Sequence, residues 1–563
     1  MTFWQIFFRV LLKRPTEALA ALYWHVTRRR LRAQNCLRAV SAKLPFGYDV
    51  WVSTVERTSE LRREAGAAIE TWPWKPNFLV QIFGRETCTE KQIQTSIQSV
   101  ERQIYPSWTL LGRGEATPEG ESEGSSFDFV VPLRAGDTLS EAALFRFAEA
   151  LQANPSAAIF YGDHDELDSR GRRARPWFKP GWNSEMFLAL DYLSQAVAIK
   201  SSLASEIGVF AEELTSERLG DALLRATTLA NGSIFHLPHV LCHVDGSFGD
   251  PGSKNRVNLV SRHLQSSDAS CAPGPFGTAK VSWPLPANLP QVSIIIPTRD
   301  KVELLRPCID SVLRLTDYQC FEIIVVDNAS AAPESLAYFD KIGTHPAIRI
   351  LRHDEPYNFS AINNLAARHA TGTFLCLLNN DTEIVEPEWL TEMMRYAVRP
   401  DVGAVGAKLL YGDGSIQHAG IVIGMGDAAG HAHRFTPANQ PGYFRQPHVS
   451  QFVTAVTAAC LVIEKQKFEA VGGFDEEKLA IAYNDVDLCL KLQAAGWSNV
   501  YVPHATLLHH ESKSRDSDFS PTQHGRYLSE LRVLQERWET KSRQDPQHNP
   551  NLDRYSETFV IRL

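Results

Sequence analysis

Two short apolar runs, each of which leads into an aspartate, constrain the fold of this chain more than any other feature. FEIIVVD ends at Asp327, and TFLCLLNND runs into Asn379, Asn380 and Asp381. Helical patterns such as KVELLRPCIDSVLRL and NFSAINNLAARHATG stand between the strand-like runs. Hydrophobic strands that alternate with helices predict an α/β fold with a parallel sheet covered by helices. Both aspartates are then expected at the edge where such sheets bind ligands.

Size and composition set the wider frame. A chain of 563 residues is long enough for two or more domains, each with its own core. A formal charge of −8 argues against a general nucleic-acid binder. The nine cysteines show no C-x-x-C pair, which predicts a reducing compartment, no disulfide framework and no structural zinc site.

The chain divides into five predicted segments, two of which resemble each other. FHLPHVLCH echoes VYVPHATLLH, and IQSVERQIYPSWTLL matches IDSVLRLTDYQCFEII in pattern. We therefore expect two copies of one Rossmann-like, mostly parallel module in tandem. The segments are a helical N-terminal segment (1–75), a first module (76–265), a Ser- and Pro-rich linker (266–290), a second module (291–515) and a C-terminal helical tail (516–563).

The first 32 residues join aromatic and basic side chains. MTFWQIFFRVLLKR and HVTRRRLRAQ suit a helix on an anionic membrane surface, or a helix packed on its own protein. A signal peptide is disfavoured because the basic residues follow the apolar part and no small-residue cleavage site is evident. No apolar run reaches the ~20 residues that span a bilayer.

The strand-end acids each have two readings. Asp327 could accept hydrogen bonds from a nucleotide base or ribose, or it could start a turn. Asp381 could hold Mg²⁺ or Mn²⁺ on a diphosphate, or it could cap the turn before EPEWL.

Two later motifs add groups of the same kind. In AIAYNDVDLCLKL, Asp485 stands where a helix begins, so it could cap the helix or deprotonate a hydroxyl. In LLHHESKSR, His509 and His510 follow a strand-like run and could bind a metal, and Arg515 could meet phosphate oxygens.

Two further patterns are weaker. GIVIGMGDAAG resembles a dinucleotide loop, but its glycines are wrongly spaced and it comes late in the module, so a Rossmann dehydrogenase is disfavoured. His418, His431 and His433 could form a metal cluster, although an acceptor-side or surface-loop position suits them better.

Taken in order, six motifs resemble those of family-2 glycosyltransferases with the GT-A fold, above all bacterial enzymes of O-antigen and other surface-polysaccharide assembly. They are VSIIIPTRDKVELLRPCIDSV, IIVVDNAS, LLNNDTEIV, VTAACLVIEKQKFEAVGGFDE, YNDVDLCLKLQAAG and LLHHESKSR. The resemblance implies a nucleotide-sugar donor, a Mn²⁺ or Mg²⁺ cofactor and no nucleic-acid partner. By position it implies donor contacts from Pro297, Thr298, Asp327, Asn379, Asn380 and Arg515, a sugar and acceptor pocket at Ala459, Cys460 and Asn484, a catalytic base at Asp485, and metal ligands at Asp381 and His509.

The second module departs from the family pattern at two positions. Asn-Asn-Asp lacks the first acid of the family's DxD motif, and Asn484 replaces the usual Glu before the base. His510 could take the place of His509 as the metal ligand.

The first copy departs further, and we expect it to lack transferase chemistry and to serve packing, acceptor binding or partner binding. Gly114 falls at the position of Asp327, and Leu219 falls at that of the base. Arg134 lies in the DxD region, with Asp137 past the usual metal acid. A second active centre stays open at three acids: Asp163, Asp165 and Asp168.

The resemblance therefore implies an inverting, metal-dependent transferase. It would move a hexose or deoxyhexose from a nucleotide-diphosphate sugar to a glycan or lipid-linked acceptor, in the cytoplasm at the inner face of the membrane. The alternative is a non-catalytic scaffold on the same fold that binds glycan or nucleotide.

Overall fold

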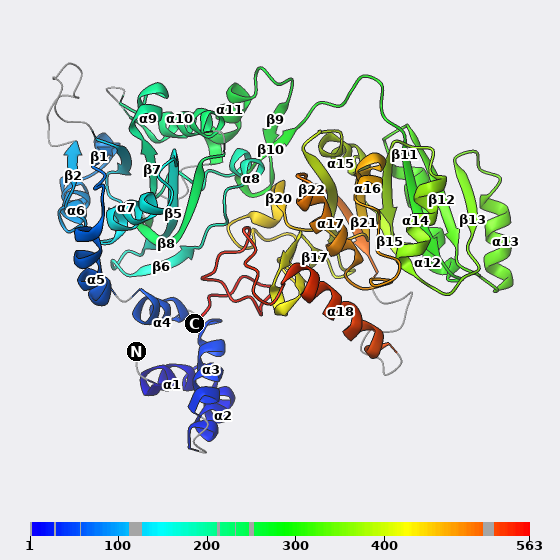
Figure 1. The fold of residues 1–563 in the computed structure, drawn as a ribbon, viewed down its shortest axis with the longest axis horizontal. Coiled ribbons are helices and arrows are strands. Elements are labelled where there is room, and N and C mark those ends of the chain that lie inside the picture. Colours follow the sequence, from blue (N-terminus) through cyan, green and yellow to red (C-terminus); the bar gives the residue numbers. More distant parts are fainter. Residues whose placement is uncertain are drawn as a thin grey trace.

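The computed structural model has two sheet modules side by side, with a group of helices below the first module and the end of the chain between the modules (Figure 1). The structure describes the whole chain except nine residues or short stretches. These are residues 1–2, 27–29, 45, 57, 112–126, 211–213, 231, 247–252 and 511–522.

The first module is built on a mixed sheet with strand order β2-β1-β3-β7-β5-β8-β4, and β6 pairs with β5. Its strands are β1 (Phe78–Phe83), β2 (Trp108–Leu111), β3 (Phe129–Arg134), β4 (Thr138–Leu139), β5 (Ile159–Leu167), β6 (Arg173–Trp177), β7 (Val197–Lys200) and β8 (Ile234–Asp245). Its helices are α6 (Glu90–Glu101), α7 (Ala143–Ala153), α8 (Ser184–Ala189), α9 (Ser201–Glu206), α10 (Ser216–Leu229) and α11 (Ser253–His263).

The second module has the order β13-β12-β11-β14-β21-β16-β22-β15, and β17 and β20 pair with β16 and β22. Its strands on this path are β11 (Val292–Thr298), β12 (Phe321–Asp327), β13 (Ile348–Arg352), β14 (Phe374–Leu378), β15 (Thr382–Ile384), β16 (Val402–Leu410), β21 (Cys460–Glu464) and β22 (Ser498–His509), and the side strands are β17 (Ile416–His418) and β20 (Gln451–Val453). Its helices are α12 (Val302–Leu315), α13 (Pro333–Ile342), α14 (Phe359–His369), α15 (Trp389–Ala397), α16 (Lys465–Ala470) and α17 (Asn484–Ala494).

The two sheets correspond strand by strand, which confirms the prediction of two α/β modules in tandem. The strand orders match when β2-β1-β3-β7-β5-β8-β4 is aligned with β12-β11-β14-β21-β16-β22-β15. Each pair of neighbouring strands is parallel or antiparallel in the same way in both modules. In each module the half of the sheet with the first three strands is parallel, and antiparallel pairs join it to the other half.

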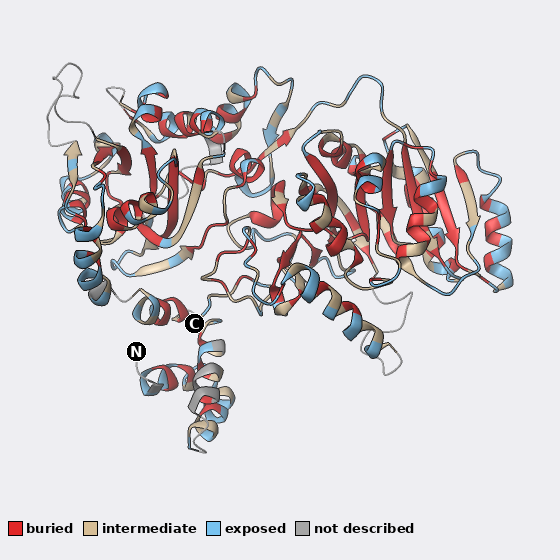
Figure 2. Ribbon diagram, in the orientation of Figure 1, coloured by how far each residue is buried: buried red, intermediate tan, exposed pale blue. Residues whose placement is uncertain are grey.

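The continuous apolar strands are explained by burial on both faces of the sheet. In β11, Ile294 and Ile296 pack into one hydrophobic cluster, whereas Ile295 between them packs into another. Successive side chains of a strand point to opposite faces, so a sheet covered on both faces needs apolar residues at every position. Figure 2 shows the central strands of both sheets in red, whereas outer strands such as β2 and β13 are largely tan.

The N-terminal segment is helical, as predicted. Its helices are α1 (Phe3–Leu11), α2 (Pro15–Val26), α3 (Arg30–Ser41), α4 (Gly47–Val55) and α5 (Thr58–Thr71). Among the described residues, no helix has the length and apolar character needed to cross a membrane.

Residues 266–290 contain a β-hairpin, which corrects the prediction of a plain linker. Strands β9 (Ser270–Pro273) and β10 (Ala279–Ser282) pair antiparallel. Val281 of β10 is buried in the core of the first module. The Ser- and Pro-rich composition concealed this one-sided burial, because the alternation of buried and partly exposed residues spans only four positions.

The C-terminal tail starts as a helix, α18 (His524–Trp538), and the chain then runs between the modules, where polar residues such as Asp545, His548 and Asn549 are buried. Asn549 donates its amide to both carboxylate oxygens of Asp163 in the first module, at 3.1 and 3.0 Å. Asp545 accepts a hydrogen bond from the backbone N–H of Ile423 in the second module. The sequence predicted a helical tail with a polar end and gave no sign that these polar groups would be buried.

Candidate functional site

Asp381 and His509 meet at the edge of the second sheet. The register of β15 and β22 places Thr382 opposite His509, so the residue before Thr382 lies next to the imidazole. The distance from Asp381 Oδ1 to His509 Nε2 is 3.1 Å. Both residues are buried, with exposed fractions of 3% and 8%. The structure therefore brings together the two residues predicted as metal ligands.

The neighbours of His509 fix its tautomer. Nδ1 lies 2.6 Å from Oε1 of Gln417, which can only accept, so Nδ1 carries the proton. Nε2 lies 3.3 Å from the side-chain nitrogen of Asn379, which donates to it. Nε2 therefore carries a lone pair, which here accepts from Asn379, and it lies 3.1 Å from Asp381 Oδ1. Sequence reasoning missed Gln417, because nothing in its local pattern indicates that a side chain of β17, which pairs with β16, reaches the end of β22.

His510 points elsewhere. Its Nε2 lies 3.4 Å from Oε2 of Glu383, whereas its backbone N–H donates to the carbonyl of Asp381. The alternation of side chains along a strand explains why neighbouring histidines face opposite sides. The geometry thus favours His509 over His510 as the metal ligand, while Arg515 lies outside the described residues.

Asp485 is tied to the same strand end through two backbone hydrogen bonds. It stands in the first turn of α17, and its Oδ2 accepts from the backbone N–H of Ala458 at 3.2 Å. The next residue, Ala459, accepts through its carbonyl from the N–H of Asn379 at 3.0 Å. Burial raises the pKa of the Asp485 carboxyl above its ordinary value, although the hydrogen bonds that the carboxylate accepts, first that from Ala458 N–H, oppose the shift.

The residues predicted to bind the donor lie along the parallel half of the sheet. Pro297 and Thr298 end β11, and the amide of Asn380 donates to Thr298 Oγ1 at 3.0 Å. Asp327 ends β12, where it accepts from the N–H of Ser330 at 2.9 Å and forms an ion pair with Arg352. Both carboxylate oxygens of Asp327 already have protein partners. A hydrogen bond from a ribose to Asp327 stays a prediction, and the carboxylate would then bind the ribose and Arg352 together.

The three residues predicted to line the sugar and acceptor pocket all contact other parts of the protein. The thiol of Cys460 is fully buried and contacts Met393 Sδ at 3.8 Å, so it belongs to the core. Asn484 donates to Ser360 Oγ at 3.2 Å and accepts from the backbone N–H of Asp485, so it helps to hold the start of α17. Ala459 is 6% exposed and acts through its carbonyl. The family position placed these residues near the site, but only the packing shows which way each side chain points.

The histidines of the weaker pattern do not form one cluster. His418 and His431 lie with their Nδ1 atoms 2.9 Å apart, whereas His433 stacks on Phe559 at 4.1 Å between ring centroids. Across the described parts of the chain, no group of three or more His, Cys, Asp or Glu side chains could hold a metal by itself. The glycine-rich stretch forms a hairpin of β18 (Ile421–Ile423) and β19 (Ala429–His431) instead of a dinucleotide turn.

In the first module, Asp137 corresponds to Asp381, which corrects the alignment that placed it past the metal acid. Thr138 pairs with His243 as Thr382 pairs with His509, and an acid precedes each threonine. The turn before Asp137 is one residue longer, which misled the linear comparison. Arg134 forms an ion pair with Asp137 at 2.9 Å. Leu219 is buried in the core, and Gly114 lies outside the described residues.

The three acids kept open as a second centre have structural partners. Asp163 accepts from Lys179 N–H, and its Oδ1 lies 2.8 Å from His236 Nε2. Asp165 binds Tyr48, Arg173 and His243, and Asp168 closes its own turn through Arg170 and Arg172. Each of the three carboxylates therefore supports a different local contact, and they do not converge on one site.

Comparison with known proteins places these observations in a family. Residues 293–468 match the model of glycosyl transferase family 2. The chain is 39% identical to an uncharacterized protein of Sinorhizobium fredii over 448 residues, 77% of this chain and 49% of that protein. It is 38% identical to the O-antigen biosynthesis protein RfbC of Myxococcus xanthus over 407 residues, 70% of this chain and 32% of that protein. Both matches are longer than the chain from residue 291 to its end, so they include part of the first module.

The chain spans half or less of the length of these curated relatives. Among solved structures, it resembles a mannosyltransferase from Pyrobaculum calidifontis in complex with GDP-Man and Mn²⁺, with 17% identity and a TM-score of 0.33. That match covers 48% of this chain and 70% of the mannosyltransferase.

Proposed function

Because residues 293–468 belong to glycosyl transferase family 2, we propose that this chain is an inverting glycosyltransferase with its active site in the second module. It would move a sugar from a nucleotide-diphosphate sugar to a glycan or lipid-linked acceptor. The observation that carries the proposal is the contact of Asp381 with His509, beside the strand end to which Asp485 is tied.

The chemistry of Asp381 and His509 fits a divalent cation. Mn²⁺ accepts both a carboxylate oxygen and an imidazole nitrogen as ligands. Mg²⁺ prefers oxygen ligands, so it would bind mainly through the carboxylate of Asp381. Two protein ligands suffice where the diphosphate of the donor supplies others. When bound there, such a cation would neutralise the charge that builds on the leaving diphosphate.

Asp485 would act as the general base. Burial raises the pKa of its carboxyl, which makes the ionised form a stronger proton acceptor. It would take the proton from the acceptor hydroxyl, while that oxygen bonds to the anomeric carbon and the bond to the diphosphate breaks. A single displacement of this kind inverts the anomeric centre.

The donor would lie over the parallel half of the sheet. Pro297, Thr298 and Asp327 would hold the base and ribose, and Asn379 and Asn380 would contact the ribose or sugar from the end of β14. This position agrees with the general rule that open α/β sheets bind ligands at the carboxyl ends of their strands.

Surface-polysaccharide assembly is the biological setting that we propose. The relative from Myxococcus xanthus is named for O-antigen biosynthesis, and its match extends beyond the second module. An acceptor carried on a lipid would place the chain at the cytoplasmic face of a membrane.

The outer face of the N-terminal helices supports membrane contact. Trp4, Phe8 and Leu12 follow one face of α1 and its end, with exposed fractions of 47%, 58% and 84%. Exposed apolar residues on α2 continue this surface, and the ring of Trp4 contacts His25 of α2. Exposed Lys13 and Arg14 lie at its border. An apolar stripe beside basic residues suits an anionic lipid surface.

The central experiment uses the purified full chain with Mn²⁺ and a panel of nucleotide sugars, with donor hydrolysis as the measured activity. We expect hydrolysis of one donor, loss of that activity in Asp381→Ala, and activity near wild type in Asp168→Ala. Asp168 is the control because it is an acid of the first module at a surface turn. Donor binding without turnover would favour the scaffold, and the reverse result for the two variants would move the active site to the first module.

Membrane contact is tested by sedimentation of the full chain with vesicles. We expect binding to vesicles that contain phosphatidylglycerol and weak binding to pure phosphatidylcholine. The double substitution Trp4→Ser and Phe8→Ser should reduce the bound fraction. Equal sedimentation of the double variant would assign this surface to another role.

A further inference from the structure

The turn that leads into Asp485 has a strained backbone. Its last residue before α17 is Tyr483, whose φ of 61° lies in the left-handed region and whose side chain does not cap the helix. A residue with a Cβ adopts this conformation only where the surrounding structure holds it. The hydroxyl of Tyr483 lies 2.7 Å from that of Tyr527 on α18, so the C-terminal helix is one element that contacts this turn.

Glu530 of α18 binds the two backbone N–H groups that precede Tyr483. One carboxylate oxygen accepts from Ile481 N–H and the other accepts from Ala482 N–H, each at 3.0 Å. Glu530 is 3% exposed and forms an ion pair with Arg526, one turn earlier in the same helix. A carboxylate suits this position because it has two acceptor oxygens and because a charged acceptor forms stronger hydrogen bonds than a neutral one.

The carbonyl groups of the same turn are bound by another helix. Ser360, in the first turn of α14, donates its hydroxyl to the carbonyl of Leu479 and its backbone N–H to the carbonyl of Ala480. The turn before α17 therefore has its carbonyl groups bound by α14 and its N–H groups bound by α18. Asp485 follows this turn directly, so its place depends on both helices.

A second contact joins α18 to α17 itself. Asp487, two residues after Asp485, is fully buried. Its Oδ1 accepts from a guanidinium nitrogen of Arg537 and from the indole nitrogen of Trp538, each at 2.8 Å. The helix α18 thus contacts both the turn before the proposed base and the first turn of the helix that carries it. The second module is therefore incomplete at residue 515, where the sequence pattern placed its end.

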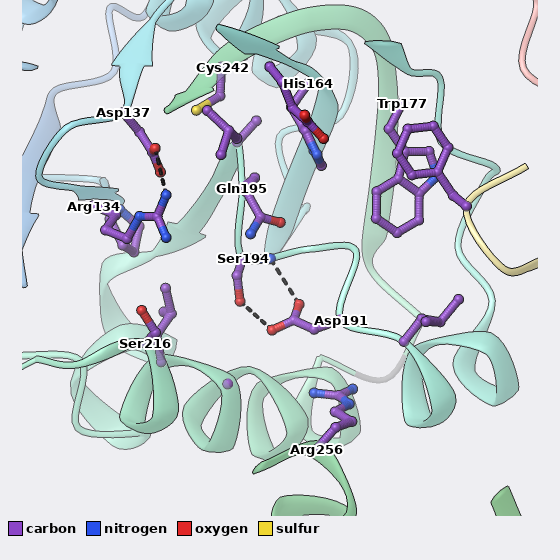
Figure 3. Close-up of a pocket in the computed structure, with 18 of the residues that line it drawn as sticks. Arg134, Asp137, His164, Trp177, Asp191, Ser194, Gln195, Ser216, Cys242 and Arg256 are labelled. Atoms are coloured by element: carbon purple, nitrogen blue, oxygen red, sulfur yellow. Dashed lines mark hydrogen bonds and ion pairs between the residues drawn. The ribbon is translucent and has the colours of Figure 1, made fainter. Parts of the chain in front are cut away.

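The first module holds its corresponding helix in a different way. α10 precedes β8 as α17 precedes β22, and α11 follows β8 as α18 follows β22. The start of α10 is capped locally, because Thr215 Oγ1 accepts from Arg218 N–H at 3.2 Å, and α11 contains no acidic residue. Figure 3 shows this first turn, with Ser216, beside the cavity of the first module. A carboxylate such as Glu530 at the turn thus distinguishes the module that carries the proposed base.

We infer that Glu530 is a positioning residue for Asp485. By binding Ile481 and Ala482 it fixes the strained turn, and the turn sets the direction in which the Asp485 carboxylate points. Because it serves the base of the proposed reaction, this role rests on the proposed function. Glu530 touches the turn and not the metal ligands, so its loss should slow proton removal and leave donor and metal binding intact. A misplacement of about 1 Å can cost ~10²-fold in rate.

The test compares Glu530→Gln with Glu536→Gln in the full chain, with donor hydrolysis in Mn²⁺ as the measured activity. The first change replaces one acceptor oxygen by an NH₂ group, so one backbone N–H loses its partner. We expect kcat to fall by ~10-fold or more, while KM for the donor and the Mn²⁺ concentration for half activity change less than about twofold. Glu536 is the control because it carries the same charge on the exposed side of α18. An unchanged kcat, or an effect on KM alone, would overturn the inference.

A double-variant cycle with Asp485→Asn separates positioning from a general loss of structure. Once Asp485 cannot act as a base, Glu530→Gln should change the residual rate by less than about twofold. An equal loss of rate in both backgrounds would make Glu530 a stabilising residue only and would overturn the inference. Tyr527→Phe is the second variant should Glu530→Gln unfold. It removes the hydroxyl that meets Tyr483 and should lower kcat about threefold, with the same dependence on Asp485.

Hydrogen exchange of the same variants distinguishes failure of this role from failure of the proposed function. The N–H groups of Ile481 and Ala482 should exchange at least ~10-fold faster in Glu530→Gln than in wild type, and at the wild-type rate in Glu536→Gln. Unchanged exchange in Glu530→Gln would overturn the inference even in an active enzyme. Faster exchange in a chain that hydrolyses no nucleotide sugar would sink the proposed function and leave Glu530 as the residue that holds the turn.

Discussion

The two modules keep the same sheet and the same pair of residues at its edge, yet only one pair meets. In each, an acid precedes a threonine that lies opposite a histidine, as Asp137 and Asp381 show against His243 and His509. Asp381 contacts its histidine, whereas Asp137 forms an ion pair with Arg134. A single guanidinium at the end of β3, where β14 leads into Asn379, separates the ion pair of the first module from the proposed metal-binding arrangement of the second.

The histidines differ through their second contact. His509 donates Nδ1–H to the amide oxygen of Gln417, and its Nε2 lies 3.1 Å from Asp381 Oδ1. His243 instead has Nδ1 at 2.6 Å from Asp165, which also binds Tyr48 of α4 and Arg173 of β6. In the first module the histidine therefore belongs to a hydrogen-bond network that connects the sheet to the N-terminal helix α4. The two modules share the same strand register, but the residues around each histidine determine which group it contacts.

The largest expected effect comes from the base. Asp485→Asn should lower kcat by ~10²–10⁴-fold, the usual contribution of a general base. Glu217→Gln is its counterpart, because Glu217 stands in the first turn of α10 as Asp485 stands in that of α17. It should leave the transfer rate near wild type. Equal losses of kcat in both variants, measured with the same donor, would contradict the assignment of the catalytic base to the second module alone.

Arg134→Asn tests the ion pair that distinguishes the first module. It leaves the buried carboxylate of Asp137 without its cation and should destabilise that module by ~3 kcal/mol at neutral pH. Burial already raises the pKa of Asp137 in the folded state, so the stability lost with rising pH should return as pH falls and the carboxyl is protonated. Thermal unfolding of the variant and of Arg134→Lys across pH measures this, and a deficit independent of pH would contradict it.

His509→Gln compares the last residue of β22 with His510, the residue that follows it. Loss of the Nε2 ligand should lower metal-dependent activity by ~10–100-fold and raise the Mn²⁺ concentration needed for half activity. His510→Gln should change both by less than about threefold, because His510 faces Glu383. A Mn²⁺ titration of donor hydrolysis separates the two, and a larger effect at position 510 would reverse the assignment.

The smallest expected effect is the position of the acid limb of the pH profile. Because burial raises the pKa of Asp485, kcat should fall with decreasing pH at a point above the ordinary aspartate value of 3.8. The base loses function when it is protonated, so activity is present above this pKa and lost below it. Asp137→Asn should leave the pH of this acid limb unchanged. A shifted acid limb in that variant would show that Asp137 of the first module influences the ionisation of Asp485 in the second.

Much of the fold was predictable from local pattern. Strands such as Ile294–Ile296 are apolar at every position, which only burial on both faces explains, and the echoes between the halves predicted the tandem modules. The hairpin at β9 and β10 and the buried end of the tail were not predictable. The hairpin buries Val281 against a distant core, and the tail residues Asp545 and Asn549 are buried because partners more than 100 residues away, such as Asp163 for Asn549, satisfy them.

The same division runs through the site. The sequence by itself determined which chemical groups the site can hold, because apolar runs lead into Asp381 and His509 and a helical pattern begins at Asp485. Tertiary structure alone decided that Cys460 points into the core, that His509 rather than His510 meets the acid, and that Asp137 is matched to Asp381. The direction of a side chain and the register of paired strands depend on contacts between distant segments, and a linear pattern does not record them.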